Sequence, residues 1–97
     1  MVSDYLTDIA SKIRDHVDQE LVPDEPSTFR LFRIYALLVL VKGADTTIED
    51  VHDAWVLWMT EIDGRHEALL PFSELSDKQR EQDRPYLNAI HAVSTTH

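Results

Sequence analysis

The sequence contains no cysteine, only two glycines and only four prolines among its 97 residues. The absence of cysteine excludes a disulfide framework, a thiolate metal site and a cysteine nucleophile. Glycine and proline are too scarce for a chain that must turn often between short strands, so the composition favours helices. No apolar run reaches the roughly 20 residues of a membrane-spanning helix, and the first residues lack the pattern of a signal peptide. We therefore expect one helical domain over residues 1–97, located in the cytoplasm (the host cytoplasm if phage-encoded).

Basic residues are also scarce, with 9 Lys and Arg against 18 Asp and Glu and a formal net charge of −9. Binding to a nucleic-acid backbone needs lysine and arginine, so the sequence argues against a nucleic-acid partner. The acidic residues are scattered along the chain rather than gathered in a tail. We interpret them as a solvated surface that keeps the protein soluble. An acidic decoy for a DNA-binding protein is an alternative, and it requires the carboxylates to share one face.

Apolar residues recur at helical spacing through most of the chain, which predicts an all-α fold. Ser3 suits the N-cap of a first helix, and the prolines within residues 22–26 end that helix. Residues 46–49 and 76–79 each match a capping box, with Thr46 or Ser76 at the N-cap and an acid or amide three residues later. We predict a compact bundle of four to five helices, at about residues 4–20, 28–42, 47–62, 77–83 and 84–94.

The second predicted helix is apolar nearly all round, since every residue but Arg33 between residues 31 and 41 is apolar. A buried strand over 34–41 is the competing interpretation, but the framing by Ser27 as N-cap and Gly43 as C′ residue favours a helix. Such a helix must be covered on most sides, and a small domain has few elements to cover it. We therefore expect a homodimer or partner interface, against the alternative of complete burial in the monomer. The predicted interface residues are Leu31, Tyr35, Leu38 and Leu40.

Residues 64–72 lack helical spacing and contain Pro71, so we predict an ordered loop there. Three apolar residues of the stretch, Leu69, Leu70 and Phe72, are expected to plug the core.

The sequence predicts no catalytic residue, no metal site and no cofactor. Its histidines form no H-x-x-x-H or H-E-x-x-H pair, no serine lies in a G-x-S-x-G elbow, and both glycines stand alone, which excludes a glycine-rich phosphate loop. Arg30 and Arg33 lie one turn apart at the start of the second helix, where cations oppose the helix dipole. A bound anion would explain them, and Arg65 could join such a site; surface ion pairs with Asp24, Glu25 or the first helix are the simpler explanation.

Two segments carry a family resemblance. Residues 51–55 read VHDAW, and residues 66–75 read HEALLPFSEL, followed by Arg80 and then Asp83 and Arg84. In this register the chain resembles the ryanodine-receptor repeat (RyR domain), as a small protein of actinobacterial or phage type. The RyR-like motif extends over about 46–93. Glu67 replaces the proline that the family has after its histidine, and residues 60–65 leave no room for the hairpin that members usually insert there.

The resemblance implies a folded interaction module, and prokaryotic members have been suggested to sense nucleotide-type ligands. Its motif residues have two interpretations, as structural packing or as the lining of a pocket formed by His52, Trp55, His66 and Phe72. In the second case Arg30, Arg33 or Arg65 would receive a phosphate. We expect a non-enzymatic binding or assembly protein whose partner is another protein or a second copy of itself. The alternative is a sensor or sponge for a small anionic, nucleotide-type ligand, and neither alternative involves a membrane.

Overall fold

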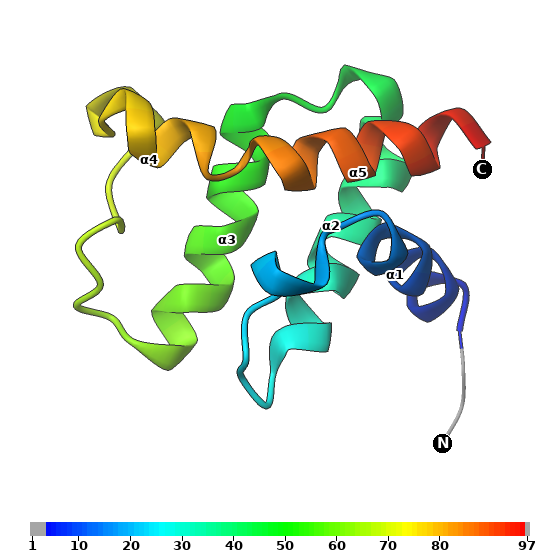
Figure 1. The fold of residues 1–97 in the computed structure, drawn as a ribbon, viewed down its shortest axis with the longest axis horizontal. Helices are drawn as coiled ribbons and strands as arrows, with labels where there is room; N and C mark the ends of the chain where they lie inside the picture. The colour runs from blue at the N-terminus through cyan, green and yellow to red at the C-terminus, as the bar shows by residue number, and fades with distance from the viewer. Residues whose placement is uncertain (1–3, 97) are drawn as a thin grey trace.

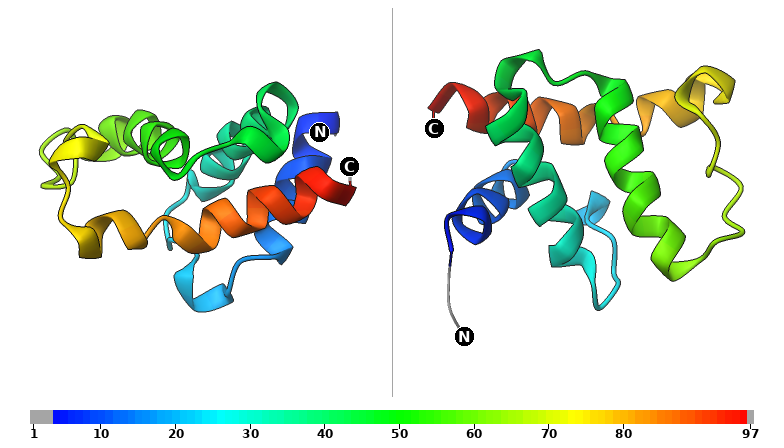
Figure 2. Two further views of the ribbon diagram at one scale, coloured as in Figure 1. Left: turned by 90° about the horizontal axis from the view of Figure 1, so that it is seen from above. Right: turned by 180° about the vertical axis from the view of Figure 1, so that it is seen from behind.

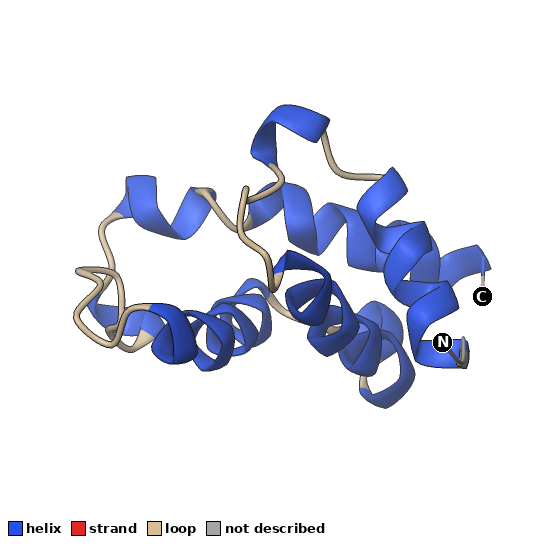
Figure 3. Cartoon of the chain, turned by 90° about the horizontal axis from the view of Figure 1, so that it is seen from below, coloured by secondary structure: helices blue, strands red, loops and turns tan. Residues whose placement is uncertain are grey.

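The computed structural model describes residues 4–96, which form five α-helices and three short 3₁₀ helices (Figure 1). No strand occurs within this range, and Figure 3 shows helices joined by loops throughout. The prediction of an all-α fold is therefore confirmed. The α-helices are α1 (Tyr5–Asp15), α2 (Thr28–Val41), α3 (Ile48–Ile62), α4 (Asp77–Glu81) and α5 (Arg84–Thr96), and the 3₁₀ helices are η1 (Gln19–Leu21), η2 (Gly43–Asp45) and η3 (Phe72–Glu74).

Helix α5 connects the two ends of the molecule. It contacts α1, α2 and α3, and Figure 1 shows it running across them with α1 at one end of the molecule and α4 at the other. The views in Figure 2 show the same order, with the loop between α3 and α4 on the side away from α1. The chain thus has a packed helical end and a loop-rich end.

The core lies where α1, α2, α3 and α5 meet. Each helix contributes apolar residues three or four positions apart, which lie on one face of a helix. The largest fully buried side chains are Trp58, Tyr35, Phe32, Ile9, Ile13, Leu31, Ile90, Val51 and Val93. At the edge of this core, the indole N–H of Trp58 donates to both the carbonyl and the hydroxyl oxygen of Ser27 (3.0 and 3.1 Å). Ser27 stands at the N-cap of α2 as predicted, but its side chain makes no capping bond there.

The first helix is shorter than predicted. It ends at Asp15 instead of continuing to residue 20, and a separate 3₁₀ turn follows, where the Asp18 carboxylate accepts from the backbone N–H of Glu20. The N-cap is Asp4, whose carboxylate accepts from the backbone N–H of Thr7 (2.8 Å). The predicted cap, Ser3, lies outside the described residues.

The capping box before α3 is shifted by one residue from its predicted position. Thr47, not Thr46, is the N-cap, and Asp50 completes the box. Thr46 is instead buried, with its hydroxyl donating to the carbonyl of Gly43 (2.8 Å). Gly43 has a φ of +56° directly after α2, as a glycine at C′ should. The second predicted capping box, from Ser76 to Gln79, is present.

The predicted interface on the second helix is wrong for two of its four residues. Leu31 and Tyr35 are fully buried, because α1, α3 and α5 cover that face of α2 within the monomer. Leu38 is half-buried and packs at the edge of the core. Leu40 is 43% exposed, and it shares the exposed part of the helix with Leu37 and Val41.

The loop between α3 and α4 is ordered, with turn hydrogen bonds from His66 N–H to the carbonyl of Asp63 and from Leu69 N–H to the carbonyl of His66. Its apolar side chains cover the core only in part. Leu69 and Phe72 are half-buried and Leu70 is 42% exposed, whereas Leu75, beyond the predicted segment, is buried.

Candidate functional site

Four side chains singled out in the sequence come together where the loop meets α3. The His52 ring stacks on Trp55 with centroids 5.8 Å apart, and the rings of Trp55 and His66 form a T-shaped pair with centroids 5.0 Å apart. The ring of Phe72 lies 6.2 Å from that of His52. His52 and Trp55 lie one turn apart on α3, so the helix presents both rings to the loop. The structure therefore assembles the predicted group of rings.

His52 is buried, and both of its ring nitrogens face protein atoms. Nε2 lies 2.7 Å from the carbonyl oxygen of Leu70, and since a carbonyl can only accept, Nε2 carries a proton. Nδ1 lies 3.6 Å from a carboxylate oxygen of Asp83. An unprotonated Nδ1 would repel an ionised carboxylate. The contact is therefore favourable when either Nδ1 or the Asp83 carboxyl carries a proton.

Among the carboxylates, Asp83 has the pKa that the fold changes most clearly. Burial raises its pKa to about 6, and the neighbouring His52 opposes that shift. The same cluster includes Tyr86, whose pKa is raised by burial and by the charge of Asp83. Behind it lies the fully buried Tyr35, whose pKa is raised for the same two reasons and whose hydroxyl has no hydrogen-bond partner among residues 4–96.

Arg80 holds the loop from the other side. Its Nε donates to the carbonyl of Phe72 (3.1 Å) and its Nη2 to the carbonyl of Ser73 (2.8 Å). The guanidinium also lies over the ring of Phe72, 5.2 Å from its centroid, which is a cation–π arrangement. The basic residue of the motif therefore fixes the backbone of η3.

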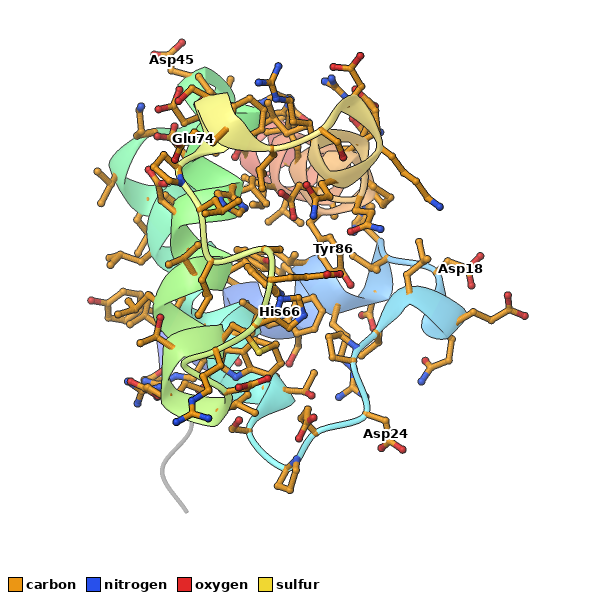
Figure 4. All side chains as sticks on the ribbon, turned by 90° about the vertical axis from the view of Figure 1, so that its left-hand side faces the viewer. Asp18, Asp24, Asp45, His66, Glu74 and Tyr86 are labelled. Atoms are coloured by element: carbon orange, nitrogen blue, oxygen red, sulfur yellow. The ribbon has the colours of Figure 1, made fainter. Side chains whose placement is uncertain are left out.

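A cavity of about 670 Å³ opens between η1 and the loop that joins α3 to α4. The hydroxyl of Tyr86 on α5 donates to the carbonyl of Leu21 and thereby ties η1 to the wall of the cavity. In Figure 4, the labelled Tyr86 and His66 both lie between α3 and the η1 segment. The lining comprises Glu20, Leu21, Pro23, His52, Trp55, His66, Ala68, Leu75, Lys78, Gln79, Glu81, Gln82, Asp83, Pro85 and Tyr86.

The predicted arginines lie outside this cavity. Arg30 pairs with Glu61 on α3 (2.9 Å) and Arg33 with Asp4 (3.1 Å), and all four side chains are exposed or half-exposed. The expectation of surface ion pairs is thus confirmed, although Asp24 and Glu25 are not the partners. Arg65 is exposed in the loop and is not part of the cavity lining. Phe72 contacts His52 but is also absent from the lining.

No three potential ligands among His, Cys, Asp and Glu gather into a metal-binding group within residues 4–96. His16 and His91 each contact a backbone carbonyl, of Lys12 and Thr46 respectively (2.8 and 2.7 Å). Within the same residues, none of the helices has the length and apolar character needed to cross a membrane.

Sequence reasoning missed the far wall of the cavity. Glu20, Leu21 and Tyr86 line it but carry no motif, and nothing in their spacing relates residue 86 to residue 21. The sequence marks Asp83 as part of the RyR-like motif and as a cap for the last helix, not as part of a cavity wall. The one available signal was chemical, since a buried histidine needs polar partners and a nearby motif acid is a natural candidate.

A family model described as "Domain of unknown function (DUF7701)" matches residues 4–95. The match covers every described residue except Thr96, including the loop and the cavity. Searches of curated proteins and of solved structures gave no match.

Proposed function

Since the chain belongs to the DUF7701 family, whose description assigns no function, we propose from its geometry that it is a non-enzymatic binding domain. Its ligand is a small planar molecule that enters the cavity beside Trp55, His66 and Tyr86. The observation that carries this proposal is the cavity itself. Its volume of about 670 Å³ lies within the range of roughly 300–1,000 Å³ of small-molecule sites, which combine an aromatic or apolar lining with a few polar groups.

The contacts of His52 support a binding role over a catalytic one. A general base needs a ring nitrogen free to reach a substrate proton. In His52 one nitrogen donates to the Leu70 carbonyl and the other faces Asp83, so the ring is held in place as a structural part of the wall. In His66, Nδ1 accepts from the backbone N–H of Ala68 (3.0 Å), so in the neutral ring Nε2 carries the proton and cannot act as the base.

The RyR resemblance implied an aromatic pocket and arginines that receive a phosphate, and the proposal retains only the pocket. An aromatic pocket beside the motif helix is supported by the gathering of His52, Trp55 and His66. Phosphate capture by Arg30 or Arg33 is not, because both guanidinium groups are paired on the outer surface. The cavity therefore offers rings on which a base would stack, but its lining includes no arginine to meet a phosphate.

A second candidate function is assembly, either with a copy of the chain or with another protein. It is favoured by five large apolar side chains that α2 and α3 leave exposed. These are Leu37, Leu40, Val41, Leu57 and Ile62, with exposed fractions of 51, 43, 70, 55 and 38%. Such residues are common on monomers one at a time, so the candidate depends on their forming one contact surface.

Native mass spectrometry on protein purified gently from cells distinguishes the two functions. Ligand binding predicts the mass of one chain plus an adduct of a few hundred daltons, which Trp55→Ala removes while the circular dichroism spectrum stays helical. Leu40→Asp is the matched control, since its side chain is exposed and outside the cavity lining, and it should keep the adduct.

Assembly predicts instead a dimer without adduct that Leu40→Asp converts to a monomer and Trp55→Ala leaves intact. A monomer of unmodified mass, combined with no thermal shift across a panel of nucleosides, nucleotides and aromatic amines, would contradict the proposed ligand binding.

A further inference from the structure

The charged side chains around the cavity are mostly acidic, whereas a phosphate ligand needs basic ones. Three carboxylates line it, from Glu20, Glu81 and Asp83, and Lys78 is the one Lys or Arg side chain in the lining. Glu81 is paired with Arg84 (3.2 Å), which lies outside the lining. Glu20 forms no ion pair among the described residues.

Resting on the proposed binding function, we propose that the ligand of this cavity is a small aromatic cation, such as an amidine or a protonated aromatic amine. Its charged group lies toward Asp83 and Glu20, and its ring lies against Trp55, His66 and Tyr86. This assigns a ligand class to the site and excludes anionic molecules of the same shape.

Asp83 supplies the first argument. Its carboxylate is buried beside Tyr35 and Tyr86, and its close contact to a basic group is the single nitrogen of His52, at 3.6 Å. A buried carboxylate is costly to ionise unless it is well paired. A cation entering from the cavity would provide a second partner, so the protein has a group that gains from binding this ligand class.

The aromatic lining supplies the second argument. The faces of tryptophan and tyrosine rings attract cations, more strongly when water is displaced. Trp55 is half-buried and its ring stacks on His52. Tyr86 is also half-buried, and its hydroxyl donates to the carbonyl of Leu21. These contacts fix the ring positions before any ligand arrives, which lowers the entropic cost of binding.

Anionic ligands are disfavoured by the same features. A phosphate or carboxylate would meet Glu20 and Asp83 with only Lys78 to offset them, and a like charge near a buried carboxylate is repulsive. No guanidinium is part of the lining. The two arginines next to it in the chain have other partners, since Arg80 donates to the carbonyls of Phe72 and Ser73 and Arg84 pairs with Glu81.

The test uses three molecules of nearly the same shape and different charge: benzamidine, benzamide and benzoate. Each is titrated into uniformly ¹⁵N-labelled full-length chain and followed by ¹H–¹⁵N NMR, with the indole signal of Trp55 as the reporter. Benzamidine should shift that signal and the amides of Asp83 and Tyr86 in a saturable way. Because a tenfold change in affinity corresponds to 1.4 kcal/mol, a single charge contact predicts benzamide to bind about tenfold more weakly, and benzoate should not bind.

Two variants test the charged groups. Asp83→Asn should weaken benzamidine binding about tenfold or more, and Glu20→Gln, an exposed change that leaves the core intact, should weaken it about threefold by loss of a partly solvated charge. Glu49→Gln is the control, because Glu49 is an exposed acid on α3 outside the lining, and it should leave the affinity unchanged.

Equal or tighter binding of benzamide or benzoate at the same signals would overturn the cation assignment and leave the proposed binding function standing. Absence of any shift with all three molecules would also overturn it, while the native mass measurement would still decide whether the cavity holds a ligand. Tighter binding of the tripeptide Gly-Arg-Gly than of benzamidine would assign the cavity to the side chain of a protein partner and overturn the small-molecule assignment.

Discussion

The two ends of this molecule are held together by different kinds of contact. At the end formed by α1, α2 and the second half of α5, fully buried side chains such as Ile13, Phe32 and Val93 pack against one another. At the end formed by the loop and α4, most side chains are exposed or half-exposed. There the structure depends on directional contacts, chiefly those that His52 and Arg80 make to the backbone of the loop.

Because their contacts differ, the two ends should respond differently when a single contact is lost. Apolar burial is non-directional and spread over many atoms, so the helical end gains its stability from the sum of its residues. A hydrogen bond from one side chain to one carbonyl is either made or lost. The loop end should therefore open locally while the helical end stays folded, which is the usual behaviour of regions with few buried apolar contacts.

The largest expected effect is at the helical end. Phe32 is fully buried and its ring contacts those of Tyr35 and Tyr86 at centroid distances of 5.9 and 6.2 Å. Phe32→Ala should lower the free energy of unfolding by about 3–5 kcal/mol, through lost burial and the cavity left behind. Chemical denaturation measures this loss. A loss below about 1 kcal/mol would show that this end is loosely packed and would remove the contrast between the two ends.

A change of pH should have an intermediate effect on stability. It acts through Asp83, which lies at the junction of the two ends. Its pKa is about 6 in the folded protein, against the ordinary 3.8, so the folded state binds its proton more tightly. Its contribution to stability is therefore complete below pH 4 and is lost as the pH rises through 6, by up to about 3 kcal/mol.

Other carboxylates titrate in the same range, so the measurement is the difference between the protein and its Asp83→Asn variant. Asparagine cannot ionise, and the variant should therefore gain stability relative to the parent protein between pH 4 and pH 7. A difference that is constant with pH would mean that Asp83 has an ordinary pKa and that the junction is solvated.

The smallest expected effect on global stability is at the loop end. His52→Ala removes the hydrogen bond to Leu70 and the partner of Asp83, and it should cost about 2 kcal/mol. Hydrogen exchange should show faster exchange in residues 64–76 while the amides of α1 and α2 stay protected. Equal acceleration in α1 would contradict the separation of the two ends. Arg80→Ala is a useful companion, because it releases the same loop from its other side.

The sequence predicted the helical end well because helix burial leaves a periodic trace. The spacing of Ile9 and Ile13 and the framing of α2 by Ser27 and Gly43 are local signals, and the structure contains both. The predicted interface was wrong at Leu31 and Tyr35, since periodicity does not reveal how many neighbours a helix has. The capping box is shifted because Thr46 and Thr47 are each followed by an acid three residues later. In the structure the Thr46 hydroxyl donates to the carbonyl of Gly43, and Thr47 forms the box with Asp50.

The candidate site was predictable only on its motif side. His52, Trp55 and His66 lie within 15 positions of each other and share a motif, and the structure brings them together. The opposite wall depends on Tyr86 reaching Leu21, a contact between residues 65 positions apart in the chain. No pattern of residue types encodes a contact at that separation, so the cavity and its acidic lining appeared only in three dimensions.

The different surroundings of the two tryptophans give the chain a built-in pair of optical reporters. Trp58 is buried with its indole N–H donating to Ser27, whereas Trp55 is half-buried beside His52 and His66. Emission from Trp58 follows the unfolding of the helical end, and emission from Trp55 follows events at the cavity. Single Trp→Phe replacements separate the two signals, so tryptophan fluorescence can monitor each end of the molecule separately.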